Sequence, residues 1–271
     1  MAPLLVVSGP SGCGKSTLAE ALRAALEATS FDATVNLIQQ DRYFTTPRPT
    51  SYWDMENKDT PDAVDMAAIR RDVRAAIASD ATLCILEGFL LLHDDELMAA
   101  ADGVLFLRAS LDACLGRRLA RSERSAHEAE GCRQYYHRTV WPEYERWTAP
   151  ALERLLAAEN TKVRVLDAEL APPIVFDAAL TALDALPLPL PAHTGAHAPL
   201  CLALSMCAQS RGAPWADLAA ALKGGGFGSP PKAALVSAVG ALAARALDSA
   251  AGGAIAPVSY THLTLPTNRE V

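Results

Sequence analysis

One short segment near the start of the chain constrains its fold more than any other: Gly9-Pro10-Ser11-Gly12-Cys13-Gly14-Lys15-Ser16. It follows a run of four apolar residues, 4–7, and precedes leucines at helical spacing, Leu18, Leu22 and Leu26. This pattern predicts a buried strand, a glycine loop and an amphipathic helix that begins at the lysine. The spacing G-x-x-x-x-G-K-S in that context is typical of a phosphate-binding loop, or P-loop.

Each part of the P-loop suits a phosphate group. The glycines let backbone N–H groups surround anionic oxygens, and the helix N-terminus adds donors and a positive dipole end. We expect Lys15 to face the outer phosphates and the Ser16 hydroxyl to complete a magnesium shell. Cys13 is expected to fill space rather than to do redox chemistry. The predicted nucleotide-binding residues of this segment are Gly9, Ser11, Gly12, Cys13, Gly14, Lys15, Ser16 and Thr17.

Four further apolar segments have the length of strands: residues 34–38, 82–86, 104–107 and 163–166. Helical patterns lie between and after them, one starting at Thr60-Pro61, expected as its N-cap and first turn, and another over 174–186. Apolar strands that alternate with helices indicate a parallel sheet covered on both faces. We therefore predict an α/β fold of the P-loop NTPase class, with three α/β/α layers, a mainly parallel five-stranded sheet and a helical lid.

Acidic residues follow two of these strands. Ligands of such sheets bind at the carboxyl ends of the strands, so Asp41 and Glu87 are expected at the same rim as the P-loop. Glu87 would hold magnesium directly or through water; the alternative is a carboxylate that caps the next turn. Asp41 would accept a proton from an acceptor hydroxyl, or else initiate a loop as an Asx turn. Asp59, in the following loop, would hold sugar hydroxyls or be exposed to solvent.

Three arginines, Arg117, Arg118 and Arg121, follow the fourth strand at helical spacing. We expect them to form a mobile lid that closes over the transferring phosphate and excludes water. Arg118 and Arg121 are predicted catalytic residues, and Arg117 is predicted to bind the nucleotide. The alternative is a solvated face paired with Asp112 and Glu123.

The composition excludes several classes of protein. A net charge of −7 argues against a nucleic-acid-binding surface. No apolar run reaches the roughly 18 residues of a membrane span. The six cysteines show neither C-x-x-C pairing nor zinc spacing, and the N-terminus has no basic region of a signal peptide. We expect a cytoplasmic protein in a reducing compartment.

The C-terminal third carries no recognisable chemistry. Residues 187–198 are expected to be a Pro-rich linker, and residues 199–257 an Ala-rich region, helical or disordered, whose role the sequence does not assign. It could be the start of a truncated second domain. Residues 258–271 resemble a translated sequencing adaptor, in which case they are a non-native tail.

Beyond these patterns, the chain resembles the nicotinamide riboside kinases, relatives of the uridine kinases, over roughly residues 3 to 186. The matching stretches are the P-loop with Thr17, Gln40-Asp41-Arg42-Tyr43-Phe44, Leu86-Glu87-Gly88-Phe89-Leu90-Leu91 and Val140-Trp141-Pro142-Glu143-Tyr144. A weaker match, Asp59-Thr60-Pro61-Asp62, lies where the family has a ribose-binding aspartate.

The resemblance implies ATP- and Mg²⁺-dependent phosphorylation of the 5′-hydroxyl of nicotinamide riboside, giving nicotinamide mononucleotide in NAD salvage. It implies that Asp41 is the base, that Asp59 binds the ribose, and that Lys15 binds the phosphates. Ser16 and Glu87 would bind magnesium. Arg118 and Arg121 would form the lid, and Arg118 would also contact the substrate. Tyr43 and Phe44 would stack on the nicotinamide ring, or else pack in the core.

Some positions depart from the family pattern. Lys58 stands where an aromatic residue would help to hold the base, and no aromatic residue follows Arg121 closely. The Arg- and Gly-rich lid pattern of uridine kinases is also missing. Two alternatives therefore stay open: a uridine or cytidine kinase, and a non-catalytic nucleotide-binding regulatory module.

Overall fold

The computed structural model describes residues 1–188 apart from residues 30–32, 48, 122–123, 159 and 187. The predicted Ala-rich region and the terminal stretch lie outside the described residues. So does the predicted linker, apart from Leu188. Within the described part of the chain, no helix is long and apolar enough to cross a membrane.

Five parallel strands form one sheet in the order β2-β3-β1-β4-β5. Their bounds are β1 Leu4–Ser8, β2 Val35–Gln39, β3 Leu83–Gly88, β4 Gly103–Arg108 and β5 Val163–Asp167. The predicted α/β fold with a parallel five-stranded sheet is confirmed. The register pairs Ser8 with Gly88, and Gln39 with Glu87. The carboxyl ends of β1, β2 and β3 therefore meet at one edge, as expected.

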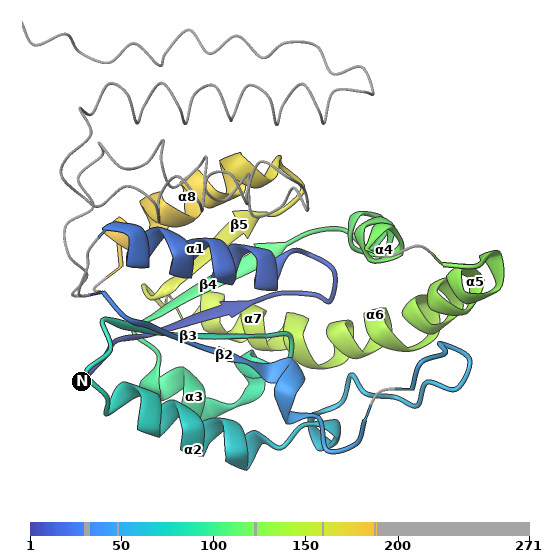
Figure 1. Ribbon diagram of the computed structural model, residues 1–271, viewed down its shortest axis with the longest axis horizontal. Coiled ribbons are helices and arrows are strands. Elements are labelled where there is room, and N and C mark those ends of the chain that lie inside the picture. Colours follow the sequence, from blue (N-terminus) through green and yellow to red (C-terminus); the bar gives the residue numbers. More distant parts are fainter. Residues whose placement is uncertain (30–32, 48, 122–123, 159, 187, 189–271) are drawn as a thin grey trace, which may run out of the picture. The chain divides into compact units, whose positions relative to one another are not determined.

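Helices cover both faces of the sheet (Figure 1). The first face carries α1 (Lys15–Thr29) and α8 (Pro172–Asp184); the second carries α2 (Met66–Ile77), α3 (Asp95–Ala100) and α7 (Ala149–Ala157). Alternation along β1 explains the two layers, because side chains of successive strand residues face opposite ways. Leu5 and Val7 pack with α1 and α8, whereas Leu4 and Val6 pack with α2 and α7.

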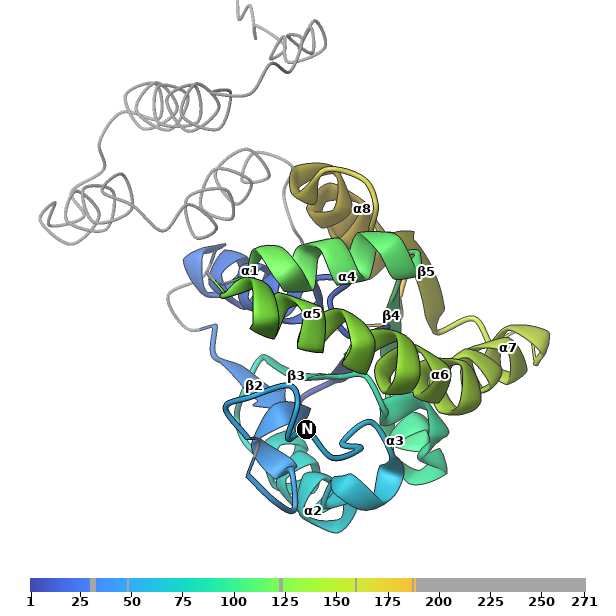
Figure 2. The same cartoon turned by 90° about the vertical axis from the view of Figure 1, so that its right-hand side faces the viewer.

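A helical arm follows β4. It begins with α4 (Leu111–Ala120) and α5 (Ala126–Tyr135), which lie side by side in Figure 2. From α5 the chain stays helical through α6 (Trp141–Glu143) into α7, with π-helical turns at Tyr136–Val140 and Tyr144–Thr148. This arm carries the predicted arginines, so it takes the place of the expected helical lid.

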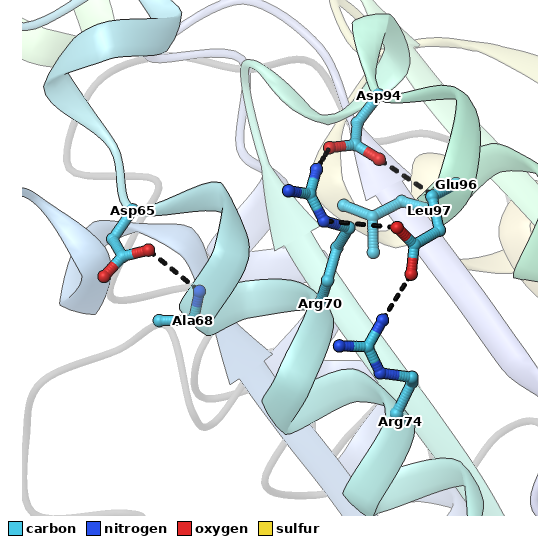
Figure 3. A network of polar contacts seen from close by, with 7 residues as sticks. All are labelled: Asp65, Ala68, Arg70, Arg74, Asp94, Glu96 and Leu97. Carbon is cyan, nitrogen blue, oxygen red and sulfur yellow. Dashed lines mark hydrogen bonds and ion pairs between the residues drawn. The ribbon is translucent and has the colours of Figure 1, made fainter.

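The helix expected to have Thr60 as its N-cap starts five residues later, with Asp65 as its N-cap. Thr60 precedes only a 3₁₀ turn, Pro61–Ala63, and makes no side-chain cap. Val64 is extended and buried in the core, which interrupts the helix, and Asp65 caps α2 by accepting from Ala68 N at 2.9 Å (Figure 3). The N-cap prediction was wrong because burial of Val64 outweighs the local Thr-Pro signal.

A polar network joins α2 to α3 (Figure 3). The buried Asp94 carboxylate caps α3 by accepting from Leu97 N at 3.0 Å, and it accepts from Arg70 Nη1 at 2.5 Å. Glu96 contacts both Arg70, at 3.4 Å, and Arg74. The network fixes α2 and α3, two of the helices that cover the second face of the sheet, against each other.

Candidate phosphoryl-transfer site

The three glycines of the P-loop are required by the backbone. Gly9, Gly12 and Gly14 have φ values of +146°, +98° and +107°. A Cβ atom on Gly9 would lie 2.4 Å from the Leu107 carbonyl oxygen, and one on Gly12 would lie 2.5 Å from that of Cys114. Gly9 and Gly12 are thus constrained by both conformation and close backbone approach, and Gly14 by conformation alone.

Lys15 and Ser16 link the P-loop to its surroundings. The Lys15 ammonium donates to the carbonyl oxygen of Pro10 at 3.0 Å, so the side chain lies across its own loop. The Ser16 hydroxyl donates to Glu87 Oε1 at 3.0 Å. Glu87 is the penultimate residue of β3 and is only 4% exposed. A hydroxyl and a carboxylate oxygen at this separation suit Mg²⁺, which prefers oxygen ligands and takes few of them from protein.

The electrostatics of Glu87 show that the predicted acidic and basic groups are neighbours. Burial raises the pKa of the Glu87 carboxyl, and the charge of Asp41 raises it further; Lys15, the Ser16 hydroxyl and Arg121 lower it. Lys15 and Asp41 therefore both act on Glu87 at this rim of the sheet. Within the described residues, no group of three or more His, Cys, Asp or Glu side chains could hold a metal. Any metal at this rim would therefore need oxygen ligands from bound phosphates and water as well.

A residue that sequence reasoning missed sets the position of Asp41. Asp41 is exposed on the 3₁₀ turn Gln40–Tyr43 that follows β2, whereas Gln40 is fully buried. Gln40 Oε1 accepts from Leu90 N at 2.9 Å, just beyond the end of β3. A Cβ atom on Gly88 would lie 2.6 Å from Gln40 Cβ. Gln40 thus packs on Gly88 and fixes the end of β2 against the end of β3.

Two of the three predicted arginines contact the P-loop. Arg117 Nη1 donates to the Cys13 carbonyl oxygen at 3.1 Å, and its Nη2 donates to that of Ala168 at 2.6 Å. Arg118 is buried and donates from Nη1 to Ser11 Oγ at 2.6 Å. Arg121 is exposed at the end of α4. A solvated face therefore does not describe Arg117 or Arg118, and Glu123 lies outside the described residues.

The predicted ribose-binding residue is buried. Asp59 is 6% exposed, so the solvent-exposed alternative was wrong, and its Oδ2 accepts from the Tyr135 hydroxyl at 3.0 Å. Lys58 is also buried, with its ammonium 3.9 Å from Glu56 Oε2. These residues lie in the loop between β2 and α2.

The two predicted ring-stacking residues contact other parts of the protein. Tyr43 donates its hydroxyl to Asp72 Oδ2 on α2 at 2.9 Å. The rings of Phe44 and Phe89 have centroids 6.4 Å apart, and both Tyr43 and Phe44 pack against the core on the second face. The core-packing alternative describes the contacts of both residues in this structure.

Known proteins resemble this chain in the same region. A family model described as "AAA domain" matches residues 5–135. A uridine kinase of Aeromonas hydrophila is 25% identical over 177 residues, covering 55% of this chain and 81% of that protein. A uridine kinase of Aliivibrio salmonicida is 26% identical over 174 residues, covering 54% of this chain and 80% of that protein.

Among solved structures, a gluconokinase from Sinorhizobium meliloti 1021 aligns with 18% identity and a TM-score of 0.42, covering 67% of this chain and 91% of that one. The glycine loop with its lysine and serine and the parallel sheet give this chain the α/β fold of the P-loop NTPase class, and its sequence is similar to those of uridine kinases.

Proposed function

We propose that this protein is a kinase that transfers the γ-phosphoryl group of ATP to the 5′-hydroxyl of nicotinamide riboside, giving nicotinamide mononucleotide. One observation carries the proposal: at the carboxyl edge of the three adjacent strands β1, β3 and β2, Glu87 accepts from the Ser16 hydroxyl and is acted on by both Lys15 and Asp41. This convergence supplies a phosphate cation, a metal carboxylate and a base, which phosphoryl transfer to an alcohol requires.

The donor half of the site is the P-loop with its arginines. The loop N–H groups and the N-terminus of α1 bind the phosphates, and Lys15 exchanges its contact with the Pro10 carbonyl for a phosphate oxygen. Ser16 and Glu87 hold Mg²⁺, which when bound neutralises charge on the β- and γ-phosphates. Arg117 and Arg118, which already contact loop residues, stabilise the negative charge that develops during transfer.

The acceptor half of the site is the loop that follows β2. Asp41 accepts the proton of the 5′-hydroxyl while the oxygen of that hydroxyl attacks the γ-phosphorus. The bond from that phosphorus to the β,γ-bridging oxygen breaks, and ADP leaves with the electron pair. Asp59 binds ribose hydroxyls, and Arg121, directly after α4, acts electrostatically on Glu87.

The identity of the nucleoside separates two candidates. The stretches 86–91 and 140–144 favour nicotinamide riboside, because they match that branch of the family. The similarity to uridine kinases favours uridine or cytidine as a second candidate. The two candidates share one mechanism and differ only in the base of the nucleoside that the site would bind.

A panel of ribosides tests the proposal. Purified full-length protein is incubated with MgATP and nicotinamide riboside, uridine or cytidine, and ADP release and the nucleoside monophosphate are both measured. We expect the highest kcat/KM for nicotinamide riboside, and loss of turnover in Lys15→Ala with every acceptor. A higher kcat/KM for uridine would replace the first candidate with the second. ATP binding without phosphorylation of any riboside would instead favour the regulatory module.

A further inference from the structure

Two consecutive tyrosines in the helical arm contact the two halves of the site. Tyr135 is the last residue of α5 and Tyr136 is the first residue of the π-helical turn. Both are buried, at 2% and 0% exposure. Successive helical side chains diverge by about 100°, so neighbours in sequence can reach different partners.

Tyr135 holds the acceptor loop. Its hydroxyl donates to Asp59 Oδ2 at 3.0 Å, lies 3.2 Å from the carbonyl oxygen of Glu56 and accepts from the N–H of Lys58 at 3.4 Å. Three contacts from one buried hydroxyl fix residues 56–59 against α5. Asp59, the proposed ribose ligand, is thereby oriented by a residue that does not itself belong to the loop.

Tyr136 holds the P-loop. Its hydroxyl donates to the Ser11 carbonyl oxygen at 2.6 Å. The Arg118 guanidinium, which donates to Ser11 Oγ, lies 5.9 Å from the centre of the Tyr136 ring. Ser11 is therefore fixed through both its main chain and its side chain, and the phosphate loop cannot shift without moving the helical arm.

More contacts attach the acceptor loop along α5. Glu128 accepts from the Ser51 hydroxyl at 2.8 Å and from Tyr52 N at 3.1 Å. The Trp53 ring stacks on His127 with centroids 4.9 Å apart. Residues 51–59 are thus connected to one helix from its first turn to its last, so they follow its position.

We propose that Tyr135 and Tyr136 are positioning residues that set the separation of the acceptor from the phosphate donor. Tyr136 fixes the P-loop and Tyr135 fixes Asp59, and the rigid helix joins them through adjacent Cα atoms. Phosphoryl transfer depends on such alignment more than on covalent chemistry by the protein. The assignment rests on the proposed function, because it presumes an acceptor bound at Asp59.

Single hydroxyl deletions test this division of roles. Tyr135→Phe and Tyr136→Phe are compared in the full-length protein by steady-state kinetics with ATP and the preferred riboside, and by calorimetric ATP binding without acceptor. We expect Tyr135→Phe to raise the riboside KM about tenfold and to leave the ATP Kd within about twofold. Tyr136→Phe is expected to raise the ATP Kd about tenfold instead.

Thr181→Val is the control for loss of a hydroxyl away from the site. Thr181 lies on α8, where its hydroxyl donates to the Asp177 carbonyl oxygen of the same helix at 3.1 Å. This control substitution should alter neither the riboside KM nor the ATP Kd. Thermal unfolding of all three variants reports any general loss of stability, which would raise both constants together rather than one at a time.

Hydrogen exchange provides a readout independent of turnover. Tyr135→Phe should speed exchange at amides of residues 51–59 and spare residues 9–16, and Tyr136→Phe should do the reverse. Equal kinetic effects of the two variants, or unchanged exchange in both segments, would overturn the assignment. If no riboside is phosphorylated, the proposed function fails, while the exchange pattern and the ATP Kd still decide whether the tyrosines fix the two loops.

Discussion

Replacing Gly88 by alanine should lower the stability of the protein and shift Asp41 relative to Glu87. The added Cβ atom would lie 2.3 Å from Gln40 Oε1 and 2.6 Å from Gln40 Cβ. Rotation of the Gln40 side chain relieves the first overlap but not the second, because Cβ moves only with the backbone of the turn that carries Asp41. The substitution must therefore shift that turn away from the end of β3.

The size of the effect follows from two contributions. Overpacking of a buried site costs about 1–3 kcal/mol. Loss of the 2.9 Å hydrogen bond from Leu90 N to Gln40 Oε1 leaves a buried donor without its acceptor, which costs about 1–3 kcal/mol. We expect the free energy of unfolding to fall by about 2–6 kcal/mol, the sum of the two contributions. We also expect a lower kcat, because Asp41 moves relative to Glu87.

Denaturant unfolding followed by tryptophan fluorescence measures the change. Gly116→Ala is the matched control, because Gly116 lies within α4 and a Cβ atom there would meet nothing within 4 Å. That variant should be unchanged or stabilised by up to about 1 kcal/mol. Adding Gln40→Gly to Gly88→Ala removes the overlap at Cβ. The free energy of unfolding of the double variant should therefore fall by less than the sum of the decreases in the two single variants. A Gly88→Ala protein within about 0.5 kcal/mol of the parent would refute the reasoning.

Three other outcomes are expected. Asp94→Ala should lower the free energy of unfolding by about 2–4 kcal/mol in urea titrations, because it removes a helix cap and one of the two carboxylate partners of the partly buried Arg70. Asp65→Ala, which removes a cap alone, should cost about 1 kcal/mol. Lys15→Ala should weaken calorimetric ATP binding; unchanged binding would contradict its role. Burial, with Asp72, raises the pKa of Tyr43 to about 12 from 10.0, so its contribution to stability is complete below pH 10.0 and is lost as the pH rises toward 12. Tyr43→Phe should flatten that part of the stability curve.

The features that could be predicted from sequence are those with a local cause. The P-loop has a fixed spacing, and the five strands are apolar runs bounded by turn residues, so both their number and their parallel arrangement follow from the pattern. The start of α2 could not be predicted in the same way. Thr60-Pro61 is a valid signal for a helical turn, and only the burial of Val64 shows that the turn ends before the helix begins.

The positioning residues depend on contacts between distant segments. Gln40 lies in the stretch 40–44 that resembles the kinase family, yet its packing on Gly88 appears only when β2 and β3 are adjacent. Tyr135 and Tyr136 form no motif, and their partners are more than 70 residues away in sequence. Helical spacing grouped Arg117 and Arg118 with Arg121 but could not show which of them reach the P-loop.

Asp41→Asn tests the central claim most directly. The substitution preserves the shape of the side chain and removes its ability to take up a proton, so calorimetric ATP binding should stay within about twofold of the parent. Turnover of the preferred riboside should fall by about a hundredfold or more, as expected for loss of a general base. Retained ATP binding together with unchanged turnover would contradict the assignment of Asp41 as the base of this site.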